Sequence, residues 1–195
     1  MKKLILLFIL IVTAIWLFGY YSKNVLTDVK RTNDKSLKAI IDSLKIDVKT
    51  IYFEIDKSDY RLSVKSGAVT LKDYSVVFGP DPVNDKLKQG DGCTPEGWFI
   101  IQSRYPHKSW KKFMWLNYPT EDSWKKHNEA IEKKVIKKND GIGGEIGIHG
   151  VPEGTDAMIG LRQNWTAGCI SLRNVDVEEI YAIVKPGSTK VLIQK

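Results

Sequence analysis

Cysteine and histidine are scarce in this chain of 195 residues, which contains two of the former and three of the latter. Two cysteines cannot supply a scaffold of several disulfides or a four-cysteine zinc site. The histidines show no spacing typical of metal ligands, and the sequence has no internal repeat. We therefore expect neither a metal nor another cofactor, and a fold that depends on a hydrophobic core.

The N-terminal segment is the one long apolar run, with no charge from Leu4 to Ser22. A helix rising about 1.5 Å per residue would cross most of a hydrocarbon core of about 30 Å over this length. Lys2 and Lys3 precede the run and favour a cytoplasmic N-terminus. Because no A-x-A-like cleavage site follows, residues 1–22 are predicted to be an uncleaved transmembrane signal anchor, with a cleaved signal peptide as the alternative. Either would place the remainder in the cell envelope, on the periplasmic side.

Positive charge is in excess, with 30 Lys and Arg against 23 Asp and Glu. A mildly basic exported domain would suit an anionic envelope, but an ordinary solvated surface explains the excess equally well. The lysine-rich stretch Lys133–Lys138 is typical of a solvated helix face. We therefore predict no nucleic-acid partner.

The rest of the chain divides into a polar linker and one domain. Residues 23–46 are expected to form a linker that ends in a short amphipathic helix, because Leu37, Ile40, Ile41 and Leu44 have helical spacing. From residue 47 to 195 the pattern predicts a mainly β domain with a few helices, an α+β fold. Strands are expected at 48–55, 60–64, 67–71, 74–78, 98–103, 145–149 and 189–194. Helices are expected at 121–138, with Trp124, Ala130, Ile131 and Val135 inward, and at 175–184, capped by Asn174.

Cys169 is the candidate nucleophile and His149 the candidate base. A thiol with a pKa of about 8.5 is weakly ionised at neutral pH. A neighbouring imidazole can take its proton and hold the thiolate in an ion pair. Gly168 lets the backbone approach a substrate carbonyl, so the amides around Cys169 can form an oxyanion hole. Taken alone, however, a single cysteine and a single histidine are more often buried structural residues.

The arrangement of these residues resembles the catalytic domain of L,D-transpeptidases, the YkuD-type domain. In that family a histidine is followed, after a gap of similar length, by Ser or Thr, any residue, Gly and Cys. Here His149-Gly150 is followed by Thr166-x-Gly168-Cys169. The resemblance extends over residues 51–193 and includes a Gly-Asp-Gly and Thr-Pro-Glu-Gly loop at 90–97. The segment around Cys169 resembles a membrane-anchored sub-branch of the family.

The resemblance implies a β sandwich or barrel around the Cys–His pair and an acyl-enzyme mechanism on peptidoglycan stem peptides. Cys169 would attack the carbonyl before a terminal D-amino acid, and an amine on a second stem would resolve the thioester. His149 would act as base and then as acid, with the Gly150 carbonyl orienting its ring and Gly168 beside the nucleophile. The residues implied to contact substrate are Thr166, Ala167, Ser171 and Arg173.

The sequence departs from the family pattern at three positions. Ala167 stands where many members carry His, and Ser171 stands where many carry Arg, although Arg173 lies two residues further on. Cys93 occupies a loop position that often holds Arg, and we expect it to be a partly buried free thiol rather than a disulfide partner of Cys169. These departures bear on how substrate is bound.

Three functions are open at this point. The first is a transpeptidase that cross-links the wall or attaches a protein to it. The second is a hydrolase of the same fold, an L,D-carboxypeptidase or amidase, in which water resolves the thioester. The third is a catalytically silent envelope-binding module, against which the presence of both Cys169 and His149 argues.

Overall fold

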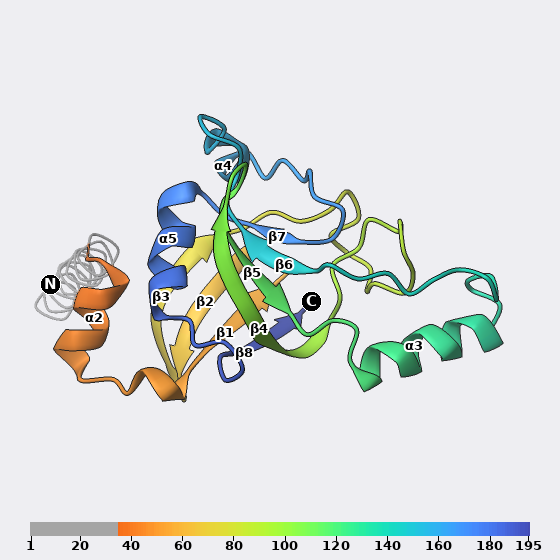
Figure 1. Cartoon of the computed structure of the whole chain (residues 1–195), viewed down its shortest axis with the longest axis horizontal. Helices are drawn as coiled ribbons and strands as arrows, with labels where there is room; N and C mark the ends of the chain where they lie inside the picture. The colour runs from red at the N-terminus through yellow and green to blue at the C-terminus, as the bar shows by residue number, and fades with distance from the viewer. Residues whose placement is uncertain (1–34) are drawn as a thin grey trace, which may run out of the picture. The chain divides into compact units, whose positions relative to one another are not determined.

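An eight-stranded sheet runs through the part of the chain that the computed structural model describes, residues 35–195 (Figure 1). Its strands are β1 (Ile51–Asp56), β2 (Arg61–Ser66), β3 (Val69–Ser75), β4 (Gly97–His107), β5 (Lys111–Leu116), β6 (Gly147–His149), β7 (Ile170–Ser171) and β8 (Lys190–Gln194). The spatial order is β3-β2-β1-β8-β4-β5-β6-β7. The pairs β1–β8 and β6–β7 are parallel, and the other neighbours are antiparallel.

Strand β4 belongs to both halves of this sheet. Residues 97–100 pair with β8, whereas the strand from Ile101 onward pairs with β5. The register shifts between Ile101 and Ser103, and a bulge of this kind bends a strand and increases its twist. Figure 1 shows β4 as a long curved strand that connects the two halves.

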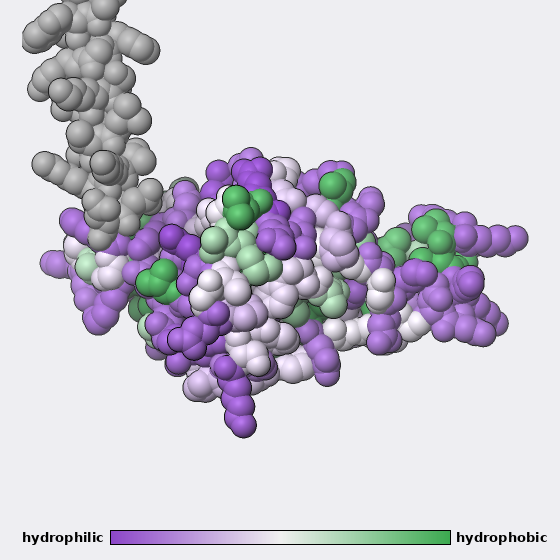
Figure 2. Space-filling model, turned by 90° about the horizontal axis from the view of Figure 1, so that it is seen from above, coloured by the Kyte–Doolittle hydropathy of each residue, from purple (hydrophilic) through white to green (hydrophobic). Residues whose placement is uncertain are grey.

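The helices of the described residues are α2 (Leu37–Leu44), α3 (Glu121–Glu132), α4 (Ala157–Gly160), α5 (Asn174–Ile183) and the 3-10 helix η1 (Val48–Thr50). Helix α2 packs against α5 and β3, and α5 packs against β5. Helix α3 stands apart from the sheet, on the side opposite α5 (Figure 1). Figure 2 shows exposed hydrophobic residues among hydrophilic ones at this end of the molecule. Helices α2 and α5 therefore lie against the sheet at β3 and β5.

The core comes from the alternation that the sequence predicts. In β1, Ile51, Phe53 and Ile55 are buried and the residues between them are not. In β8, Val191 and Ile193 are buried in the same way. Each such side chain contributes about 1.5–3 kcal/mol relative to exposure, so the two parallel strands at the centre of the sheet carry much of its stability.

The predicted α+β class is confirmed, with the strands joined in one continuous sheet. The short helix expected at the end of the linker is present as α2, although Leu44 is exposed. The expected strand at 74–78 does not exist as a separate element, because Tyr74 and Ser75 end β3 and Val77 pairs only with Ser171. Two strands, β5 and β7, were not predicted.

The helix expected at 121–138 ends at Glu132, and its predicted inward face is correct at Ala130 but wrong at Trp124 and Val135. Trp124 and Val135 are 47% and 65% exposed, and the buried helical residues are Ser123, His127 and Ala130. A positive φ of 59° at Lys134 is incompatible with a continuing helix. The second predicted helix is present as α5, but Arg173 rather than Asn174 holds the cap position.

The predicted signal anchor at residues 1–22 and the first half of the predicted linker lie outside the described residues. Between residues 35 and 195, no helix has both the length and the apolar character that crossing a bilayer requires.

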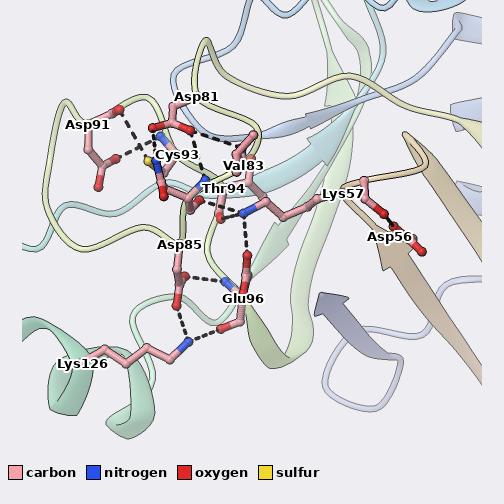
Figure 3. Close-up of polar contacts among 12 residues, drawn as sticks. Asp56, Lys57, Asp81, Val83, Asp85, Asp91, Cys93, Thr94, Glu96 and Lys126 are labelled. Carbon is pink, nitrogen blue, oxygen red and sulfur yellow. Dashed lines mark hydrogen bonds and ion pairs between the residues drawn. The ribbon is translucent and has the colours of Figure 1, made fainter. Parts of the chain in front are cut away.

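Lys57 is a buried cation that fixes the loop between β3 and β4. Its side chain is fully buried directly after β1. Its Nζ lies 2.7 Å from the Asn84 carbonyl, 3.3 Å from the Thr94 carbonyl and 2.8 Å from the Glu96 carboxylate (Figure 3). An ammonium has three donors, so every one is used. Lys126 of α3 reaches the same loop, 2.8 Å from the Glu96 carbonyl.

We expect Lys57→Met to lower the free energy of unfolding by about 3 kcal/mol, because it leaves Glu96 and two carbonyls without their partner. Urea denaturation followed by circular dichroism measures the change. The matched control is Lys38→Met, which removes an exposed pair with Asp42 and should cost less than about 1 kcal/mol. Equal losses in the two variants would contradict the role given to Lys57.

Candidate active site

A cavity of about 890 Å³ lies beside β5 and β6, and both Cys169 and His149 line it. Aromatic side chains of the β4–β5 hairpin form one side. The other lining residues come from the loop before β4, from residues 143–146 before β6, and from residues 165–169 before β7. The two residues predicted to do chemistry therefore face the same enclosed volume.

The pairing of β6 with β7 brings these two residues together. In this parallel pair Ile148 is opposite Ile170 and His149 is opposite Ser171. The Leu172 amide donates to the His149 carbonyl at 2.9 Å. Cys169 directly precedes β7 in the chain, so the register of the pair places it beside Gly147 at the start of β6, two residues before His149.

The His149 ring is held in one orientation. Its Nδ1 lies 2.7 Å from the Gly150 carbonyl oxygen, and since a carbonyl only accepts, Nδ1 carries the hydrogen and Nε2 is left as the acceptor. The ring stacks on Trp110 at 4.6 Å and on Phe113 at 5.5 Å between centroids. Burial lowers the pKa of His149 to about 4, although the bond to Gly150 acts in the opposite direction. The imidazole is therefore neutral at pH 7.

Ser171 supports the carbonyl that orients this ring. Its hydroxyl donates to the Gly150 carbonyl at 3.2 Å, so one oxygen accepts from both Ser171 and His149. Ser171 is fully buried and does not line the cavity. The structure thus places it behind the histidine rather than beside a bound substrate.

Cys169 is partly exposed and lines the cavity. Its Sγ lies 3.4 Å from the Glu145 carbonyl oxygen. Burial raises the pKa of the thiol to about 11, and the positive charge of Lys86 acts against this rise. Together with a neutral His149, this indicates a thiol and an imidazole at rest rather than a preformed ion pair.

The turn before Cys169 is fixed by Thr166 and by a glycine. The Thr166 hydroxyl accepts from the Gly168 amide at 3.2 Å and donates to the Cys169 carbonyl at 2.8 Å. Gly168 has a φ of +134°, and a Cβ there would lie 2.6 Å from the Cys93 carbonyl oxygen. Only glycine fits this position. Thr166 and Ala167 both line the cavity.

Two further predicted residues lie away from the cavity. Arg173 forms a two-contact pair with Asp176, at 2.6 Å and 3.0 Å, and does not line the cavity. Cys93 is buried, and neither it nor Cys169 is in a disulfide. Burial raises the pKa of the Cys93 thiol to about 12. The backbone carbonyl of Cys93, rather than its thiol, lies against Gly168 in the turn before Cys169.

Sequence reasoning missed the aromatic side of the cavity and its one lysine. Trp110, Phe113 and Trp165 surround the imidazole, and Lys86 lines the same cavity. Phe113 and Trp115 are two residues apart, and in a strand this spacing places both side chains on one face. The sequence could therefore have indicated them. Within residues 35–195, no cluster of three or more His, Cys, Asp or Glu side chains is arranged to hold a metal ion.

Comparison with known proteins gives the family. The sequence model of YkuD, the L,D-transpeptidase catalytic domain, matches residues 50–193. No curated protein matches the chain.

Two solved structures share the fold. The helical cell shape determining protein Pgp2 of Campylobacter jejuni is 19% identical, with a TM-score of 0.53, and the match covers 85% of this chain and 53% of Pgp2. Bd1075 of Bdellovibrio bacteriovorus is 20% identical, with a TM-score of 0.53, and the match covers 74% of this chain and 48% of Bd1075. The matched region is thus about half of each solved structure. Since the family model spans most of the sequence, the chain belongs to the YkuD family of L,D-transpeptidase catalytic domains.

Proposed function

We propose that this chain is a cysteine-dependent L,D-transpeptidase that acts on peptidoglycan stem peptides. One observation carries the proposal: Cys169 and His149 line one cavity, and the Gly150 carbonyl holds the imidazole so that Nε2 is the proton acceptor. The family, whose members are L,D-transpeptidase catalytic domains, supports this class of reaction.

The first half of the reaction forms a thioester. His149 Nε2 takes the thiol proton as Cys169 Sγ attacks the carbonyl carbon before the terminal D-amino acid. The C–N bond breaks, and the imidazolium returns the proton to the departing amine. Because both groups are neutral at rest, we infer that proton transfer accompanies the attack. The Gly168 amide is engaged by Thr166, so we assign the Cys169 amide as the oxyanion donor.

The second half transfers the acyl group. An amine on another stem peptide, or on a protein to be attached to the wall, attacks the thioester, and His149 takes its proton and returns it to sulfur. Water in place of the amine would give an L,D-carboxypeptidase from the same intermediate. The two outcomes differ in product mass, since transfer gives cross-linked dimers and hydrolysis gives shortened monomers.

The proposed location follows from the sequence. Residues 1–22 would anchor the chain in the membrane, and the domain from 47 to 195 would act on the periplasmic side, within reach of the wall. Pgp2, a helical cell shape determining protein, shares the fold, and this supports a role for this chain in wall remodelling that affects cell shape.

Replacing Cys169 by Ala tests the nucleophile. We expect wild-type protein incubated with muropeptides to remove a terminal D-amino acid and to carry a thioester on Cys169, both detectable by mass spectrometry. Cys169→Ala should lower turnover by at least about a thousandfold with an unchanged circular dichroism spectrum. Cys93→Ala is the matched control and should retain turnover. Activity that survives in Cys169→Ala would show that the nucleophile is wrongly assigned.

The pH dependence tests the state of His149. The imidazole acts as a base only when neutral, and burial lowers its pKa to about 4. We therefore expect kcat/KM to stay level as the pH falls through 6.5, the ordinary histidine value, and to drop only near pH 4. The measurement is kcat/KM for a muropeptide between pH 4 and 9. An acidic midpoint between pH 6 and 7 would contradict a buried, neutral base.

A further inference from the structure

Lys86 is a buried cation that faces the cavity containing Cys169. Among the described residues it is the one Lys or Arg that lines this cavity, and it is only 5% exposed. Its Nζ donates to the Lys88 carbonyl at 3.0 Å and to the Asp91 carboxylate at 2.8 Å. Burying an ammonium is costly, so its presence at the cavity calls for a chemical reason.

The partner of Lys86 is itself heavily shared. Asp91 also accepts from the amides of Leu87 and Lys88, each at 2.9 Å, and from the amide of Cys93 at 3.1 Å. Figure 3 shows Asp91 and Cys93 on this loop. The Asp91 carboxylate thus accepts from four donors, the Lys86 ammonium and three backbone amides. Lys86 has three N–H donors, of which these contacts use two, so one is left for a group in the cavity.

Other charged groups near the cavity do not offer a substitute. Arg173 is paired with Asp176 and lies outside it. The Lys88 side chain pairs with Asp140 at 3.1 Å and does not line it. Glu145 does line it, but it has the charge of a carboxylate substrate. Between residues 35 and 195, an anion that enters this cavity can therefore find a lysine or arginine partner only at Lys86.

The proposed reaction brings an anion to this place. Three covalent bonds join the attacked carbonyl carbon to the carboxylate carbon of a terminal D-amino acid, and each is about 1.3–1.5 Å long. When Cys169 Sγ reaches the carbonyl, the carboxylate must therefore lie within a few ångströms, in the same cavity. The positive charge of Lys86 also lowers the pKa of the Cys169 thiol, which indicates that its field reaches the reacting sulfur.

We propose that Lys86 binds the terminal α-carboxylate of the donor stem peptide, and that it thereby restricts the enzyme to peptides ending one residue after the attacked carbonyl. This inference rests on the proposed function. A peptide that continues past that residue, or that ends in an amide, would leave the cation without an anionic partner. Lys86 then selects the donor, whereas the acceptor, which arrives after the amino acid has left, does not depend on it.

The test compares a donor stem peptide bearing a free C-terminal carboxylate with the same peptide as a C-terminal amide, using the full-length chain. We expect wild type to prefer the acid by about 10- to 100-fold in kcat/KM, the range for a hydrogen bond to a charged group. Lys86→Gln should lose most of this preference through a higher KM for the acid, while its KM for the amide changes little. Lys88→Gln makes the same change on the same loop outside the cavity and should keep the preference.

Two readouts separate binding from folding. Melting temperature and the rate of Cys169 alkylation by iodoacetamide report whether Lys86→Gln keeps the site intact, and the wild-type comparison of acid with amide needs no variant. Equal use of acid and amide by wild type would overturn the proposal. So would equal losses on both substrates in Lys86→Gln. If wild type turned over neither peptide and formed no thioester on Cys169, the proposed function itself would fall, and this inference with it.

Discussion

The candidate site depends on a very short parallel pairing between β6 and β7, anchored by the bond from the Leu172 amide to the His149 carbonyl. Parallel strands cannot be joined by a tight turn and require a crossover connection. Here the connection contains α4 and then returns along the cavity, where Trp165, Thr166 and Ala167 line it. The crossover segment that joins β6 to β7 thus also forms the wall of the cavity beside Cys169.

The two reacting groups are uncharged at rest, although the buried cation Lys86 lines the same cavity. Aromatic rings and burial keep His149 and Cys169 neutral, which lets a proton move between them without a standing ion pair. The loop between β3 and β4 has little regular structure and relies instead on ammonium groups. Lys57 holds its base through Asn84, Thr94 and Glu96, and Lys86 holds its tip through Asp91. In this loop, the hydrogen bonds of two buried lysines take the place of the backbone ladder that would hold a strand in a sheet.

Strands in which buried and exposed residues alternate strictly could be predicted from the sequence, whereas strands that lack this alternation could not. Strands β1 and β8 follow the pattern, whereas β5 buries the adjacent residues Phe113 and Met114, and β7 is too short to leave a period. Trp124 was expected in the core because its helix looked amphipathic, but α3 stands away from the sheet. The Cys169 and His149 positions were predicted through resemblance to the family. The burial of Ser171, and the presence of Lys86 at the cavity, come from long-range contacts that no local pattern records.

The close approach of Gly168 to the Cys93 carbonyl has a consequence for protein engineering. The contact is between backbones, so the identity of the side chain at 93 is a secondary matter, whereas the length of the loop that carries it is critical. An insertion or deletion in that loop would shift the carbonyl against which the turn of Cys169 rests. Transplanting this loop from a homologue would therefore succeed only together with the segment around the nucleophile. New substrate range is better sought by exchanging single side chains that line the cavity.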